Sequence, residues 1–104
     1  MELSRYYLCL LRKGPAWTAE ETPESKQLQA RHLAHTLEHV SSGAAIAAGP
    51  VTDGGEIVGC AIFVTPTVEE AHTRMAADPG VQAGRFTFEL HPWLTPKGQL
   101  PERT

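Results

Sequence analysis

Cysteine is scarce in this sequence, and long hydrophobic runs are absent. The two cysteines, Cys9 and Cys60, lie far apart, outside any CxxC pair and within short apolar runs. This excludes a disulfide scaffold and a CxxC metal site, and it predicts two buried, reduced thiols. No stretch reaches the roughly 18 consecutive apolar residues that a membrane span requires, and the N-terminus lacks the pattern of a signal peptide. We therefore expect a cytoplasmic protein.

Basic residues are also few, and they do not cluster. Nine Lys and Arg residues stand against twelve Asp and Glu residues, which gives a formal net charge of −3 at pH 7. Scattered positive charge provides no electrostatic footprint for nucleic acid or for an anionic membrane. The sequence also lacks a glycine-rich phosphate loop and a recognisable Ser-His-Asp arrangement. The expected partner is a small molecule or another protein.

The chain is long enough for one domain with a single modest core. Its 104 residues are 41% hydrophobic and 20% charged, which is an ordinary composition for a globular protein. We expect one domain over residues 1–94, followed by a polar, proline-containing tail over residues 95–104.

Hydrophobic periodicity predicts four strands and two helices. Strands are expected over residues 4–13, 44–51, 56–64 and 84–93, with a glycine-rich hairpin turn between the second and the third and Pro92 closing the last. Helices are expected over residues 23–42 and 65–80, the first capped by Thr22 or Ser25 and ended by Gly43. The apolar stripe expected to face the core from the first helix consists of Ala30, Leu33, Leu37 and Val40.

This order of elements predicts an α+β, ferredoxin-like βαββαβ fold. Both helices then lie on one face of a four-stranded antiparallel sheet. The strands over residues 4–13 and 56–64 are apolar on both faces, although helices cover only one of them. A second copy of the chain is the simplest cover for the other face. We therefore expect a homodimer in which two sheets meet face to face.

Three of the five histidines lie within a ten-residue stretch of the first predicted helix. His32, His35 and His39 lie within about 60° of one another, on the side away from the leucine stripe. They could be a metal site, a catalytic base beside two bystanders, or the solvated face of the helix. Together they span roughly 10 Å along the axis, too far to share one ion, although His35 and His39 could bind a metal weakly as a pair. We expect a solvated face, with no metal and no other cofactor.

Five further residues are candidates for contacting a small molecule, and each also has a structural explanation. Trp17 could close over a flat ligand or pack as a loop residue, and Tyr6 could donate a hydrogen bond into a pocket or belong to the core. Gly49 and Pro50 could line a pocket with backbone atoms or simply end a strand. His72 lies on an apolar helical stripe and is either a packing residue or part of the site.

The segments RHLAH, GAAIAAGPV, EEAHTRMAADPGVQAG and FTFELHPW follow one another between residues 4 and 93. In order and spacing they resemble the YCII-related (YciI-like) domain family of dimeric α+β barrels. The resemblance implies an active-site pair formed by His32, in the first segment, and Asp78, in the third. It also implies dehydrochlorinase-like chemistry, the elimination of chloride from a chlorinated hydroxyquinol, or an isomerisation. Where many members carry a bulky residue after Asp-Pro, this sequence has Gly80.

The predicted topology also brings His32 and Asp78 together. In a βαββαβ layer the two helices run antiparallel, so the first half of one lies beside the end of the other. A carboxylate there can accept the imidazole N–H, fix its tautomer and leave the second nitrogen as a general base. The same hydrogen bond could instead only tie the two helices together, and both explanations stay open.

The sequence therefore favours a cofactor-free lyase or isomerase that acts on a small cyclic or aromatic oxygenated molecule. His32 would be its general base, oriented by Asp78. The alternative is a non-catalytic small-molecule-binding or accessory module of the same family.

Overall fold

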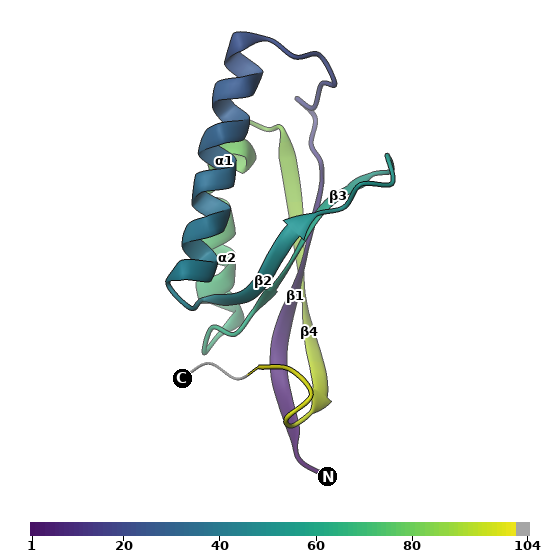
Figure 1. Ribbon diagram of the computed structural model, residues 1–104, viewed down its shortest axis with the longest axis vertical. Coiled ribbons are helices and arrows are strands. Elements are labelled where there is room, and N and C mark those ends of the chain that lie inside the picture. Colours follow the sequence, from purple (N-terminus) through teal and green to yellow (C-terminus); the bar gives the residue numbers. More distant parts are fainter. Residues whose placement is uncertain (102–104) are drawn as a thin grey trace.

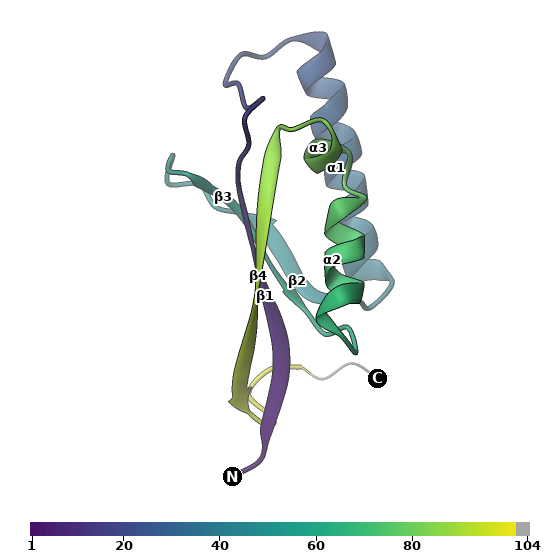
Figure 2. The same ribbon diagram turned by 180° about the vertical axis from the view of Figure 1, so that it is seen from behind.

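The chain forms one antiparallel sheet with helices on one side (Figures 1 and 2). The elements in chain order are β1 (Leu3–Lys13), α1 (Pro23–Ser41), β2 (Ala45–Pro50), β3 (Ile57–Phe63), α2 (Val68–Ala76), α3 (Pro79–Gln82) and β4 (Phe86–Pro96). The computed structural model describes residues 1–101, so the last three residues of the predicted tail lie outside the described part. The strand order β2-β3-β1-β4 confirms the predicted ferredoxin-like α+β fold.

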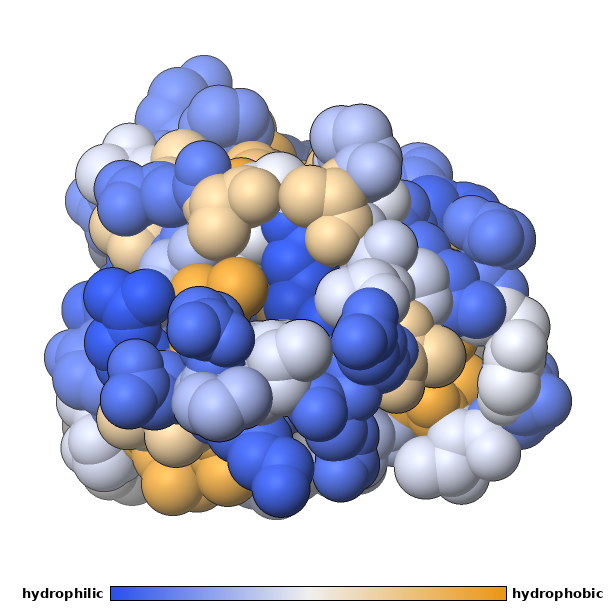
Figure 3. Space-filling view, turned by 90° about the horizontal axis from the view of Figure 1, so that it is seen from above, coloured by the Kyte–Doolittle hydropathy of each residue, from blue (hydrophilic) through white to orange (hydrophobic). Residues whose placement is uncertain are grey.

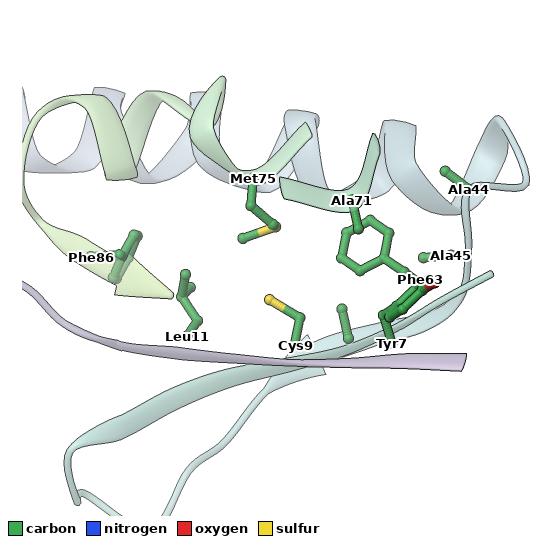
Figure 4. Packing of buried hydrophobic residues seen from close by; sticks show 10 residues of the cluster. Tyr7, Cys9, Leu11, Ala44, Ala45, Phe63, Ala71, Met75 and Phe86 are labelled. Carbon is green, nitrogen blue, oxygen red and sulfur yellow. The ribbon is translucent and has the colours of Figure 1, made fainter. Parts of the chain in front are cut away.

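The core lies between the helices and the side of the sheet that faces them (Figure 4). Alternate side chains of β1, among them Cys9 and Leu11, point toward the helices, as the two-residue period of a strand requires. Ala71 and Met75 of α2 meet them from the other side. Phe63 of β3 is 0% exposed and fills the end of the core near β2.

A capping box begins α1. Thr22 Oγ1 accepts a hydrogen bond from the Ser25 N–H at 3.1 Å, and Ser25 Oγ accepts one from the Thr22 N–H at 2.9 Å. The two alternative cap residues of the prediction therefore act together, which satisfies two N–H groups that the helix leaves unpaired. Gly43, at a φ of 81°, then turns the chain toward β2. Neither α1 nor any other helix within residues 1–101 is long and apolar enough to cross a membrane.

The rotation of α1 about its axis differs from the prediction. Leu33 and Leu37 are 53% and 60% exposed, whereas His39, on the supposedly solvated stripe, is 2% exposed. The histidine stripe faces the α2–α3 segment, where His32 and His35 each find a hydrogen-bond partner. These two hydrogen bonds reduce the usual penalty against turning imidazole rings toward the interior. The prediction of a solvated histidine face and a core-facing leucine stripe is wrong.

Two boundaries also differ from the prediction. The second predicted helix is divided, because Asp78 caps a separate turn, α3, in which Pro79 occupies the first position and needs no N–H partner. The last strand does not end at Pro92 but continues to Pro96, still paired with β1. Because β4 is an edge strand, a residue without an N–H is tolerated there. The paired strand thus extends beyond the expected domain boundary at residue 94.

Gly14 follows β1 at a point where another backbone segment passes very close. A Cβ at Gly14 would collide with the Gly84 carbonyl oxygen and lie 2.9 Å from the Phe86 nitrogen. Because backbone atoms cannot rotate away, we expect Gly14→Ala to lower the free energy of unfolding by about 1–3 kcal/mol, measured by urea denaturation. Gly49→Ala is the matched control, because its Cβ would meet nothing within 4 Å. Equal stability of the two variants would contradict this close approach.

Candidate active site

His32 of α1 and Asp78 form a hydrogen-bonded pair at the start of α3. His32 Nδ1 lies 2.8 Å from Asp78 Oδ1, and the two side chains are 13% and 1% exposed. The second carboxylate oxygen, Oδ2, accepts a hydrogen bond from the Val81 N–H at 3.1 Å and so caps α3. The Asp78 carboxylate therefore holds the imidazole of His32 and also stabilises the first turn of α3.

The pair also determines which nitrogen of His32 carries the hydrogen. An ionised carboxylate only accepts hydrogen bonds, so Nδ1 is the donor and Nε2 keeps its lone pair when the ring is neutral. Within residues 1–101, Nε2 has no hydrogen-bond partner. His32 is also among the residues that line a cleft.

The cleft lies between α1 and the β2–β3 hairpin and has a volume of about 690 Å³. Cys9 and Leu11 of β1 form part of its floor. The exposed side chains of Leu33 and Leu37 form one wall, which accounts for an apolar stripe that does not face the core. A mostly apolar cleft of this size with a few polar groups suits a small organic molecule.

Phe86 occupies the space beside the pair. Its ring centroid lies 4.7 Å from that of His32. A Cβ at Gly80 would lie 2.5 Å from Phe86 Cδ2 and 3.0 Å from Asp78 Oδ2. Glycine at position 80 therefore makes room for the Phe86 ring, which gives the imidazole an apolar neighbour.

Cys9 lies on the cleft floor but is not a nucleophile there. Burial, with a smaller contribution from Cys60, raises the pKa of the Cys9 thiol to about 12. Since the thiolate is the reactive form, this thiol is inert at neutral pH. Both cysteines are free, as predicted, although Cys60 is only partly buried.

The other two histidines of α1 are structural. His35 Nε2 donates to the Arg74 carbonyl oxygen at 2.9 Å, and its ring centroid lies 4.5 Å from that of His39. His39 packs edge-on against Phe63, with centroids 5.2 Å apart. Burial first, then the nearby His35 and Arg74, lower the pKa of His39 to about 4. Within residues 1–101, no three His, Cys, Asp or Glu side chains are grouped so that they could hold a metal.

Three of the predicted ligand-contacting residues share the cleft with His32. These are Trp17, Gly49 and Pro50. Trp17 comes from the loop before α1, and its ring centroid lies 6.1 Å from that of Phe86. The loop tryptophan is thus packed beside the site and also lines it.

Tyr6 and His72 lie elsewhere. Tyr6 is 3% exposed on the opposite face of the sheet, where its ring packs 6.4 Å from that of Trp93. His72 lies in a separate groove between α2 and β4, and its ring centroid is 5.1 Å from that of Phe88. For both residues the structure favours the packing explanation over a place in the cleft.

Sequence reasoning missed Lys13 and Arg85, which bring two positive charges to the cleft beside Trp17. Lys13 is the last residue of β1 and Arg85 directly precedes β4, where Lys13 pairs with Phe86. A partial signal was available, because the end of the first strand adjoins the start of the last in the predicted antiparallel sheet, although the register decides which residues meet. Far apart in the sequence, they looked unrelated.

Comparison with known proteins identifies relatives of this fold. Residues 6–93 match the family model of the YCII-related domain. Among solved structures, the chain is similar to 5-chloro-2-hydroxyhydroquinone dehydrochlorinase (TftG) from Burkholderia phenoliruptrix, in complex with 2,5-dihydroxybenzoquinone. The sequences are 21% identical, the match covers 85% of this chain and 92% of that chain, and the TM-score is 0.55. At this identity the likeness establishes the fold. No curated protein matches the chain by sequence.

Asp78→Asn should move the hydrogen of His32 from Nδ1 to Nε2. The asparagine oxygen can still accept the Val81 N–H and cap α3, which leaves the amide NH₂ facing Nδ1. Nδ1 must then accept, and Nε2 carries the hydrogen in place of its lone pair. Long-range ¹H–¹⁵N spectra should show the two ring-nitrogen shifts of His32 exchanging roles while those of His35 stay in place. An unchanged tautomer in a folded variant would contradict the proposed geometry.

The pKa of His39 predicts a loss of stability in acid. The pKa of His39 is about 4 in the folded chain, whereas its ordinary value of 6.5 applies to the unfolded chain. Between these two pH values the unfolded chain therefore binds more protons than the folded chain does. The stabilisation is therefore complete above pH 6.5 and is lost as the pH falls through this window. Between pH 7 and 4.5 we expect the wild type to lose about 2–3 kcal/mol more unfolding free energy than His39→Phe, measured in urea. Equal losses would contradict the assignment.

Proposed function

The chain belongs to the YCII-related domain family, and from that premise we propose that it is a lyase- or isomerase-type enzyme for small cyclic oxygenated molecules. In this proposal His32 is the general base and Asp78 orients it. One observation carries the proposal: His32 lines a cleft of about 690 Å³ while its Nδ1 is held by a buried carboxylate. An imidazole with one nitrogen fixed and the other open to a ligand is suited to proton transfer near neutral pH.

In the proposed reaction, Nε2 of His32 removes a proton from a ring carbon made acidic by a neighbouring carbonyl group. The electron pair of that C–H bond forms a new double bond. In an elimination the adjacent bond to a leaving group such as chloride breaks, the group leaves with the electron pair, and the imidazolium then gives its proton to water. In an isomerisation the imidazolium returns the proton to a different carbon of the ring. Asp78 stabilises the imidazolium that exists between these steps. The proton transfer needs only the two side chains, so we expect a cofactor-free reaction.

The likeness to TftG supports the choice of substrate class. That protein is a dehydrochlorinase of a chlorinated hydroxyhydroquinone, and its bound 2,5-dihydroxybenzoquinone is a flat oxygenated ring. In this chain the wall formed by Leu33 and Leu37 offers an apolar surface of the kind on which such a ring packs.

His32→Gln should abolish catalysis while the fold remains, because glutamine can still hydrogen-bond to Asp78. Loss of a general base lowers the rate by about 10²–10⁴-fold. The measurements are chloride release and deuterium uptake from D₂O, followed by NMR, over a panel of chlorinated hydroquinones and cyclic enol-lactones. Arg31→Gln is the control, since Arg31 is exposed on the same helix and lies outside the cleft.

Two outcomes would oppose this proposal. Full turnover by His32→Gln would remove His32 from the reaction. Binding of panel compounds in the cleft without turnover by the wild type would favour the alternative, a non-catalytic small-molecule-binding or accessory module.

A homodimer through the uncovered face of the sheet is part of the proposal. Leu8 and Leu10 of β1 point away from the helices and pair with Ile62 and Cys60 of β3, and all four are partly exposed. No helix lies on this side in Figures 1 and 2. The end of the molecule seen in Figure 3 offers only small, separate hydrophobic patches. The sheet face is therefore the surface that a second copy is expected to bury.

Leu10→Glu should convert the dimer into a monomer, because a charge would be buried without a partner between the two sheets. Light scattering at micromolar concentration measures the mass directly. Val40→Glu, which places the same charge on an exposed position of α1, should leave the dimer intact. A wild-type chain that is monomeric under these conditions would refute the dimer.

A further inference from the structure

We propose that the ligand of the cleft is an anion, and that Lys13 and Arg85 bind its negatively charged oxygen atoms. The expected class is a small ring compound that carries a carboxylate, phenolate or enolate group. This inference rests on the proposed function in placing the ligand beside His32, but it concerns the charge of the ligand rather than the reaction.

The charge of the cleft is opposite to that of the chain. The chain carries a net charge of −3. The cleft lining nevertheless includes Lys13 and Arg85, and within residues 1–101 it contains no Asp or Glu side chain. In a concave site with low-dielectric walls, charge of one sign raises the local concentration of ligands of the other sign. A cationic cleft on an acidic protein thus selects for anions.

The two cations surround one indole ring without a counter-charge. Lys13 Nζ lies 5.3 Å and Arg85 Cζ 4.4 Å from the centroid of Trp17. Neither side chain has a carboxylate within 4.0 Å among residues 1–101, whereas Arg12 and Arg74 each form such an ion pair. The indole face attracts each cation, but two neighbouring like charges repel each other, and a negative charge between them would relieve that repulsion. A bound anion would supply that charge.

One edge of the Arg85 guanidinium has no hydrogen-bond partner within residues 1–101. Its Nη1 donates to the Thr18 carbonyl oxygen at 3.1 Å, which anchors the guanidinium over Trp17. Its Nε is buried and has no hydrogen-bond acceptor within residues 1–101. A buried donor without an acceptor is costly, and the edge formed by Nε and Nη2 is the one that binds a carboxylate with two parallel hydrogen bonds. In this proposal the guanidinium turns about its hydrogen bond to Thr18, so that this edge meets the ligand.

Phe86 has both Arg85 and the base beside its ring. The Phe86 centroid is 4.7 Å from that of His32 and 5.5 Å from Arg85 Cζ. A cyclic ligand packed over this region can therefore reach the guanidinium with one substituent while a ring atom faces His32. The anionic group would fix the orientation of the ring, and an enolate formed during proton abstraction would be stabilised by the same charges.

A matched pair of probes tests the inference: benzoate and benzamide, which have nearly the same shape and differ in charge. Affinities are measured by NMR titration of the whole chain, with the signals of His32 and Phe86 as reporters of the cleft. Wild type should bind benzoate at least about tenfold more tightly than benzamide, because charge-assisted hydrogen bonds exceed neutral ones in strength. This preference should weaken as salt is added.

Arg85→Gln and Lys13→Gln should each reduce the affinity for benzoate by about tenfold and leave that for benzamide nearly unchanged. Arg85→Lys, which keeps the charge but loses the fork, should fall between wild type and Arg85→Gln. Arg31→Gln removes the same charge outside the cleft and should change neither affinity. Circular dichroism of each variant confirms that it is folded.

The outcomes separate this inference from the proposed function. Selective benzoate binding by a protein that fails to catalyse, or by His32→Gln, would support the anion site while the proposed function fails. Equal affinity for the two probes, no binding of benzoate in the cleft, or full benzoate affinity in both folded Gln variants would overturn the anion site, whatever the catalytic assays show.

Discussion

The site depends on the two hydrogen bonds that the buried carboxylate of Asp78 accepts. A carboxylate that is 1% exposed needs hydrogen-bond donors, and it receives one from His32 Nδ1 and one from the Val81 N–H. The first bond ties α1 to the segment before β4. The second caps α3, a helix of only four residues that would not be stable alone. One side chain therefore sets both the position of α1 and the direction of the base.

This constraint explains why α1 carries its polar and apolar residues on unexpected sides. With His32 held by Asp78 and His35 by the Arg74 carbonyl oxygen, the histidine stripe must face inward. Leu33 and Leu37 are then turned to the cleft, where they remain 53% and 60% exposed. The helix uses its polar stripe for internal hydrogen bonds and its apolar stripe for a wall that a ligand can cover. The exposed leucines are thus a consequence of the site and not a defect of the fold.

The sequence was sufficient for the topology, which follows from local patterns and the rules of a βαββαβ layer. The pairing of His32 with Asp78 was expected from the resemblance to the YCII-related family together with that topology. The sequence was insufficient for the rotation of α1, since periodicity identifies an apolar and a polar stripe but does not show that the polar stripe finds hydrogen-bond partners inside the fold. The prediction ended the last strand at Pro92, because proline cannot donate a hydrogen bond to a neighbouring strand. The strand order places β4 at the edge of the sheet, where that donor is not needed, and this order cannot be read from Pro92 itself. Lys13 and Arg85 were missed because their proximity depends on the β1–β4 register.

The central claim is that His32 Nε2 acts on a ring bound in the cleft between α1 and the β2–β3 hairpin. The most direct measurement is a crystal structure of the protein with 2,5-dihydroxybenzoquinone, the molecule bound by TftG. We predict that the ring lies in this cleft with one of its atoms about 3–3.5 Å from His32 Nε2, the separation expected for reacting groups. A ring bound in the groove beside His72, or a His32 Nε2 engaged by a protein group in the complex, would contradict the claim.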